Sequence, residues 1–299
     1  MNLDKGPERW ANDLSILLTQ AYGPNRFPVD VSKLAGDYSK QVFPDEPITR
    51  VRARGFEGFE GALTPKPNGS GEWGIGYSSS LRSRGRVNFT IAHELGHYLL
   101  HRKKYPQGFQ CRPEDMVRWD SEYNRVEAEA NRFAAGLLMP LDDFRAQLPA
   151  NQKTDLDMLC GCADRYEVSL TAAILRWLTY TQKRAILVVS REGFILWARS
   201  SEPAFKSGAF IKVAGLPPQE VPDASPVAKS NGAIGIVEPK ELRKGTWLNE
   251  PVVEHSLISE RYDLSISLLI LQASAPSIGI AEEVTEDMVD ILSRPFNHR

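Results

Sequence analysis

The sequence predicts an α+β fold built from two or three domains, and three observations support this prediction. A length of 299 residues exceeds the usual size of one domain. Between residues 10 and 180, apolar residues recur mainly at the three- and four-residue spacing of amphipathic helices. From residue 184 onward, short apolar runs rich in β-branched and aromatic residues are separated by turn residues, which is the pattern of strands.

The composition favours a soluble protein and argues against several other classes. A hydrophobic content of 42% and a charged content of 25% are ordinary for soluble globular proteins. A formal net charge of −2, without a basic run, offers no bulk attraction for nucleic acid. No apolar run has transmembrane length, and Cys111, Cys160 and Cys162 lack disulfide or zinc-knuckle spacing. We therefore expect a cytoplasmic protein that contacts neither membranes nor, directly, nucleic acid.

The N-terminal segment is expected to form an amphipathic helix. It lacks the basic start and apolar core of a signal peptide. Its apolar residues instead fall on one side of a helical wheel, and these are Trp10, Leu14, Leu17, Leu18 and Ala21.

Residues 90–101 contain the pattern His-Glu-x-x-His, which is typical of zinc hydrolases. Each helical residue advances by about 100°, so His93 and His97 lie one turn apart on one face and can reach the same ion. Glu94 lies beside them, where it can take a proton from water that the ion activates. The spacing therefore predicts a metal site with a general base, and a third protein ligand must complete it.

The motif is expected to follow a short strand. Residues 86–89 have the pattern of that strand, and Asn88 or Thr90 is a suitable N-cap for the helix. Gly96 costs the helix about 1 kcal/mol relative to Ala, which indicates that another group approaches the backbone there.

His101 is the nearest further histidine, and geometry excludes it as the third ligand. A helix rises about 1.5 Å per residue, so His93 and His101 lie about 12 Å apart along the axis. Bonds from zinc to histidine nitrogen are about 2 Å long, so one ion cannot reach both residues. We expect His101 to interact with the dipole or the last carbonyls of the helix instead.

A second predicted helix, residues 125–140, supplies the third ligand. Glu127 borders its apolar arc, whereas Glu129 lies among charged neighbours on the solvated side. A carboxylate at the edge of a buried face needs a partner, and a metal ion is a suitable one. Glu127 is therefore the predicted ligand, and Asn131 is placed to orient a ligand histidine through a hydrogen bond.

The two segments, in residues 89–101 and 127–140, resemble the ImmA/IrrE family of zinc metallopeptidases. Residues 27–35 and 59–63 are also similar to entry segments of that family, so the resemblance covers about residues 10–145. It implies a gluzincin-like peptidase domain, in which two histidines and a glutamate hold one zinc ion and a polar residue follows the glutamate by four positions.

In this chain, the resemblance places the metal ligands at His93, His97 and Glu127, the orienting residue at Asn131 and the general base at Glu94. Members of the family typically cut a helix-turn-helix transcriptional repressor, in phage-like elements or in a radiation and desiccation response. The resemblance therefore implies a repressor protein as substrate and partner.

Three features near the site allow more than one interpretation. Residues 72–78 form either an edge strand to which a substrate peptide adds or a core strand of the sheet. Cys111, between the two helices, could coordinate zinc and inhibit the site, although an ordinary thiol is the simpler interpretation. No spacing selects the residue that stabilises the oxyanion, and several arginines compete with the tyrosines Tyr77, Tyr98, Tyr105 and Tyr123.

Beyond residue 140, two further helices are predicted at residues 155–166 and 170–180, joined by a short turn. This arrangement is similar to a helix-turn-helix unit. However, the second helix offers mainly Thr171, Arg176 and Thr179 on an apolar body, whereas a DNA reader needs several polar groups. A structural pair of helices is therefore favoured over a DNA-binding one.

The last part of the chain is predicted to be rich in strands. A hairpin with a three-residue turn is expected at residues 185–199, followed by a long loop at residues 216–230. Further strands are expected at residues 233–237, 251–259 and 264–271, with a closing helix near residues 282–292. In IrrE-like members a GAF-like domain follows the peptidase, so the resemblance implies an α/β GAF-like regulatory domain here.

These expectations define three domains and two functional hypotheses. The domains are a peptidase at residues 1–148, a helical segment similar to helix-turn-helix units at 149–182 and a GAF-like domain at 183–299. The first hypothesis is a zinc endopeptidase, and the alternative is a zinc-containing regulator or scaffold that binds DNA or a partner without proteolysis. Glu94 favours the first, because a structural zinc site needs no general base.

Overall fold

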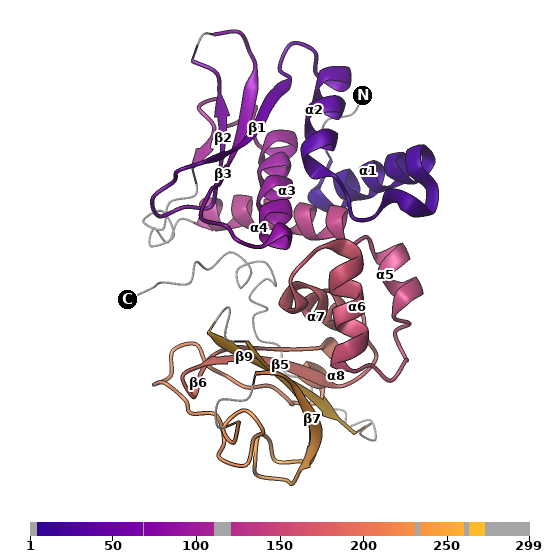
Figure 1. The fold of residues 1–299 in the computed structure, drawn as a ribbon, viewed down its shortest axis with the longest axis vertical. Helices are drawn as coiled ribbons and strands as arrows, with labels where there is room; N and C mark the ends of the chain where they lie inside the picture. The colour runs from indigo at the N-terminus through magenta and orange to yellow at the C-terminus, as the bar shows by residue number, and fades with distance from the viewer. Residues whose placement is uncertain (1–4, 68, 111–120, 231–233, 260–262, 273–299) are drawn as a thin grey trace. The chain divides into compact units, whose positions relative to one another are not determined.

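Helices and two separate β-sheets make up the structure, a computed structural model (Figure 1). This mixed architecture confirms the predicted α+β class. Contacts divide the chain into two compact units, with residues 163–172 belonging to the first unit together with the chain up to Asp143. The structure describes residues 5–67, 69–110, 121–230, 234–259 and 263–272.

The first unit begins with α1 (Pro7–Tyr22), whose apolar side is narrower than its wheel predicts. Trp10, Leu14 and Leu18 are buried as expected, but Leu17 is 41% exposed. The reason is close packing on one side only, since α1 lies against α4 (Ser121–Leu138). The buried side holds these residues at four-residue spacing together with Ala11 and Ser15, so Leu17 is left on the solvent side. The prediction that Leu17 and Ala21 belong to the buried stripe was wrong.

A short 3₁₀ helix, η1 (Gly23–Arg26), connects α1 to α2 (Val31–Val42). The carboxylate of Asp30 caps α2 by accepting a hydrogen bond from the backbone N–H of Lys33 at 2.9 Å. Buried Arg26 donates to the carbonyl of Ser15 at 3.0 Å, which ties this connection to α1.

The first sheet has the strand order β1-β3-β2-β4. Its strands are β1 (Ile48–Arg54), β2 (Gly61–Pro65), β3 (Trp73–Ser78) and β4 (Phe109–Gln110). Strand β3 pairs in parallel with β1 and antiparallel with β2, so both of its edges are occupied. Residues 72–78 therefore provide a core strand, and the edge-strand alternative for them was wrong.

The motif helix α3 (Arg84–Leu100) begins earlier than predicted. The side chain of Ser83 accepts a hydrogen bond from the backbone N–H of Arg86 at 3.1 Å and caps the helix. The short strand expected at residues 86–89, and the caps expected at Asn88 or Thr90, were therefore wrong. Because the cap at Ser83 lies upstream of residues 86–89, these residues are inside the helix, where their backbone groups form helical hydrogen bonds in place of strand pairing.

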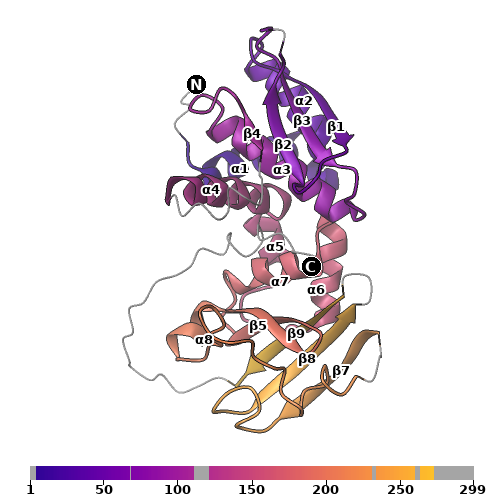
Figure 2. The same ribbon diagram turned by 90° about the vertical axis from the view of Figure 1, so that its left-hand side faces the viewer.

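Helix α3 is enclosed by the first sheet and by α4 (Figure 2). Gly96 is the point of closest approach, because a Cβ atom there would lie 3.0 Å from Phe133 and 3.2 Å from the backbone of Ala130. This confirms that another group approaches the backbone at Gly96. The apolar arc predicted for α4 is buried, with Val126, Ala130, Phe133 and Leu137 no more than 3% exposed.

Three helices follow α4 in the chain, namely α5 (Leu141–Gln147), α6 (Leu156–Tyr166) and α7 (Leu170–Leu178). The last two correspond to the predicted helical pair. Glu167 lies in the turn between them with a positive φ of 47°. This turn packs closely against Gly85, in the first turn of α3. A Cβ atom on Gly85 would lie 2.8–3.0 Å from the carbonyl of Glu167 and the backbone of Val168.

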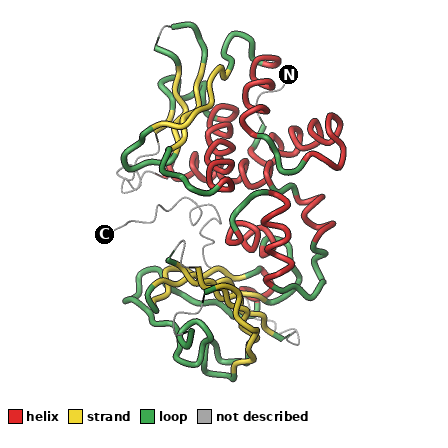
Figure 3. Tube along the Cα trace, viewed as in Figure 1, coloured by secondary structure: helices red, strands yellow, loops and turns green. Residues whose placement is uncertain are grey.

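The second unit contains an antiparallel sheet, whose strands are yellow in Figure 3. The strand order of this sheet is β6-β5-β9-β8-β7. Its strands are β5 (Ala185–Arg191), β6 (Phe194–Ser200), β7 (Gly235–Leu242), β8 (Val252–Ser259) and β9 (Leu264–Leu271), and α8 (Glu202–Lys206) follows β6.

The hairpin of β5 and β6 turns more tightly than predicted. Arg191 pairs with Phe194, which leaves two residues in the turn in place of three. Glu192 and Gly193 both have positive φ angles, 48° and 81°. A two-residue hairpin turn of type I′ requires positive φ at both positions.

Two expectations, from different parts of the chain, fall outside the described residues. These are the closing helix at residues 282–292 and the interpretation of Cys111. Among the helices that the structure describes, none combines the length and the apolar character that a bilayer crossing requires.

Replacement of Gly96 by Ala tests the close approach of α3 and α4. Overpacking costs about 1–3 kcal/mol, and we expect it to outweigh the gain in helix propensity of about 1 kcal/mol. Denaturant unfolding of Gly96→Ala should therefore show reduced stability. Gly36→Ala is the matched control within α2, because its Cβ would meet only ordinary van der Waals contact at 3.9 Å. A stabilised Gly96→Ala variant would contradict this account of the packing.

Candidate metal centre

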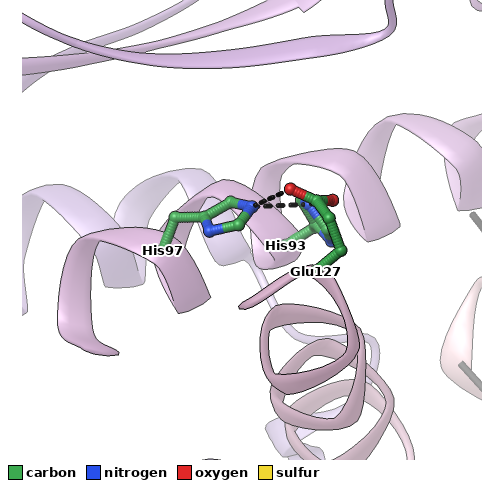
Figure 4. Close-up of side chains that lie close together, drawn as sticks. All are labelled: His93, His97 and Glu127. Carbon is green, nitrogen blue, oxygen red and sulfur yellow. Dashed lines mark hydrogen bonds and ion pairs between the residues drawn. The ribbon is translucent and has the colours of Figure 1, made fainter. Parts of the chain in front are cut away.

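Helices α3 and α4 bring three metal-binding side chains together (Figure 4). The Nε2 atoms of His93 and His97 lie 2.9 Å apart, because the two residues are one turn apart on α3. Glu127 reaches them from α4, with its Oε2 atom 3.2 Å from Nε2 of His93 and its Oε1 atom 3.2 Å from Nε2 of His97. One ligand atom of each residue lies within 4.8 Å of the other two, so a single ion can contact all three.

The electrostatics of this cluster favour a positive charge at its centre. Burial alone would lower the pKa of His93, but the charge and hydrogen bond of Glu127 outweigh it and raise that pKa to about 9. Burial would raise the pKa of Glu127, yet the two histidines hold it well below its ordinary value. A divalent cation would provide this positive charge, and imidazole nitrogens with a carboxylate are the ligands that zinc takes in catalytic sites.

His97 is held in the form that binds metals. Its side chain is fully buried, and this burial lowers its pKa to about 4, so its imidazole is neutral near pH 7. Its ring stacks on Phe109 of β4, with centroids 4.2 Å apart and an interplanar angle of 14°. Sequence reasoning missed Phe109, because no spacing relates this residue to the motif.

Glu94 lies beside the cluster as a buried carboxylate. It is 1% exposed, and its Oε2 atom has no hydrogen-bond partner among the described residues. Burial raises its pKa to about 8. A buried carboxylate oxygen without a partner is costly for stability, which indicates that a group taking part in function meets it.

Gly61 of β2 leaves the space that Glu94 occupies. A Cβ atom at this position would overlap the carboxylate of Glu94 and the methyl group of Thr90. Only glycine allows the strand to pass so close to the helix. The sequence analysis included Gly61 in residues 59–63 of the family resemblance. It did not reveal that a larger residue would overlap Glu94.

Asn131 contacts His93, the candidate metal ligand next to Glu94 in the sequence. Its Oδ1 atom lies 2.8 Å from Nδ1 of His93, the ring nitrogen opposite the one that faces the cluster. An acceptor in this place keeps the proton on Nδ1 and leaves Nε2 free to bind an ion. The structure thus places Asn131 where the sequence analysis expected an orienting residue.

His101 and Glu129 do not behave as the sequence analysis expected. His101 is 5% exposed, its Nδ1 atom lies 3.1 Å from Nδ1 of His97, and its Nε2 atom lies 3.0 Å from Glu129. His101 stands at the C-cap of α3, as its predicted position requires, but its ring nitrogens contact side chains and not the last carbonyls. Glu129 is thus more than a solvated residue. A helical wheel shows that His101 lies one turn after His97, but not that Glu129 comes within reach from another helix.

The structure narrows the choice of oxyanion donor among the four tyrosines. The hydroxyl of Tyr98 donates to the carbonyl of Glu46 at 2.7 Å, so it is already engaged. Tyr105 packs edge-on against Phe109. The side chain of Tyr123 lies outside the described residues.

Comparison with known families supports the geometry. Residues 45–178 match a peptidase family model described as the IrrE N-terminal-like domain. This range contains the three clustered side chains and Glu94. No curated protein matches the chain significantly.

Replacement of Glu127 by Ala should abolish tight binding of one zinc ion per chain. The two histidines alone supply too few ligands, and removal of the carboxylate leaves their buried donor atoms without a counter-charge. Metal analysis after dialysis measures this loss. Glu8→Ala is the control, because it removes a carboxylate that contacts the surface of the same helix through Arg132 at 3.0 Å. Equal zinc content in both variants would reject Glu127 as a ligand.

Proposed function

Since the chain carries a peptidase domain of the ImmA/IrrE family, we propose that it is a zinc-dependent endopeptidase. The observation that carries this proposal is the position of Glu94, which is buried beside the cluster of His93, His97 and Glu127 and has one oxygen without a hydrogen-bond partner among the described residues. A purely structural zinc site uses four protein ligands and needs no such carboxylate.

The residues of the site support a mechanism by general acid–base catalysis. When bound, zinc would act as a Lewis acid that makes water acidic enough to attack and polarises the scissile carbonyl. Glu94 takes the proton from the attacking water and passes it to the leaving amine. Asn131 keeps His93 in the tautomer that directs Nε2 toward the ion.

We assign the stabilisation of the oxyanion to Tyr77. It pairs with Gly61 across β3 and β2, and directly opposite residues of an antiparallel pair project to the same face of a sheet. A Cβ atom at Gly61 would point at Glu94. The side chain of Tyr77 therefore lies on the face of the sheet that meets the site. Its phenol can donate a hydrogen bond to a developing negative charge.

The proposed substrate is a helix-turn-helix transcriptional repressor, cut in a stress or mobile-element response. The resemblance to the ImmA/IrrE family supports this choice. The alternative is a regulator that keeps the metal but acts by binding DNA or a partner without proteolysis. The unpaired carboxylate of Glu94 counts against that alternative, because it would destabilise a protein that made no use of it.

We further propose that residues 183–299 form a GAF-like regulatory domain and that the helices at residues 149–182 act structurally. The antiparallel sheet of five strands in the order β6-β5-β9-β8-β7 supports a separate sheet domain after the peptidase.

Glu94→Gln should keep zinc and fold but lose peptidase activity. Removal of a positioned general base costs about 10²–10⁴-fold in rate, and the amide keeps the volume of the side chain. The measurement is cleavage of the repressor encoded next to the gene, after co-expression with either form of the protein. Substantial cleavage by a zinc-loaded Gln variant would assign the proton transfer to another residue.

Tyr77→Phe should lower kcat for the same cleavage and change KM little. Loss of one oxyanion donor typically costs about 10²–10³-fold in kcat. Tyr105→Phe is the matched control, since it removes the same hydroxyl from a ring that packs against Phe109. Equal activity of the two variants would remove Tyr77 from the mechanism.

A further inference from the structure

A chain of two hydrogen bonds leads from His97 to the surface of the first unit. Its members are His97 on α3, His101 at the C-cap of α3 and Glu129 on α4, joined by distances of 3.1 Å and 3.0 Å. The two histidines are buried, whereas the Glu129 side chain is 26% exposed and lies 3.7 Å from Arg125. Neither His101 nor Glu129 contributes a donor to the metal cluster itself.

Once His97 binds an ion, only one placement of the protons on the rings of His97 and His101 satisfies both hydrogen bonds. Its Nε2 atom faces the cluster, so its proton is on Nδ1 and is donated to Nδ1 of His101. His101 must then accept at Nδ1 and carry its own proton on Nε2. That proton points at the carboxylate of Glu129, which accepts it.

From this arrangement we propose that His101 and Glu129 are positioning residues for the metal ligand His97. The inference rests on the proposed zinc site and extends it. The carboxylate orients His101, and His101 orients the ring of His97 and makes its Nε2 atom a stronger donor toward the ion. Because both rings are buried, water does not replace either hydrogen bond when it is lost.

The two ligand histidines are therefore held in different ways. His93 is oriented directly by a neutral amide, the side chain of Asn131. His97 is oriented by a second imidazole that is itself tied to a charged group. The ring of Phe109 fixes the plane of His97 but offers no acceptor, so it cannot replace His101 in choosing the tautomer.

The first test measures zinc affinity of the full-length protein by competition with a chromophoric chelator. His101→Leu should weaken affinity by about 10–100-fold, as loss of such partners of metal ligands typically does. His101→Asn should restore much of it, because its Oδ1 atom can accept in place of Nδ1. Glu129→Gln should weaken affinity less than His101→Leu does.

Two controls separate positioning from general effects of charge or packing. Asp37→Asn removes a carboxylate from an exposed pair with Lys33 that has the same four-residue spacing as Arg125 and Glu129, and affinity should not change. The double variant His101→Leu/Glu129→Gln should bind zinc no more weakly than His101→Leu alone, since Glu129 acts through His101. Additive losses would overturn this order of action.

The second test reads the protons directly, by nuclear magnetic resonance of the zinc-loaded protein with isotope-labelled histidine. The chain has five histidines, so single substitutions suffice to assign them. His101 should be protonated on Nε2 and unprotonated on Nδ1. Protonation on Nδ1, or unchanged affinity in His101→Leu, would overturn this inference alone. Absence of tight zinc binding by the wild-type protein would overturn the proposed function as well.

Discussion

The close contact of α3 with α4 is the constraint on which the candidate site depends. At Gly96 the two helices approach until a single Cβ atom would strike Phe133 and the backbone of Ala130. This contact lies next to His97, a candidate metal ligand, and sets the distance at which Glu127 reaches the histidines. A larger residue would push the helices apart, and a displacement of about 1 Å is half the length of a zinc–ligand bond.

The buried polar groups of the site differ in how completely their hydrogen-bonding atoms have partners. The ligand side chains hold one another through their charges, and the ring nitrogens that face away from the cluster are engaged by Asn131 and His101. Glu94 alone among these groups has a carboxylate oxygen without a partner in the described part of the chain. This arrangement costs stability at one residue, which supports the proposal that Glu94 acts on substrate.

The sequence was informative where the relevant interactions are local. Helical spacing places His93, Glu94 and His97 beside one another, and the same periodicity separates Glu127 from Glu129 on α4. One error was itself local, because the start of α3 is set by the cap at Ser83, three residues before Arg86. The other depended on a distant element, since the pairing of β1 with β3 encloses a strand that its own residues could equally place at an edge.

By itself, the sequence determined the α+β class, the motif helix and the residue types that a metal-dependent hydrolase needs, because these follow from periodicity and short-range spacing. Only the tertiary structure decided what surrounds the ligands. Phe109 and Gly61 come to the site from strands of the first sheet, and Glu129 comes to His101 from α4. No pattern along the chain encodes such contacts, since they depend on how closely and at what angle separate elements pack.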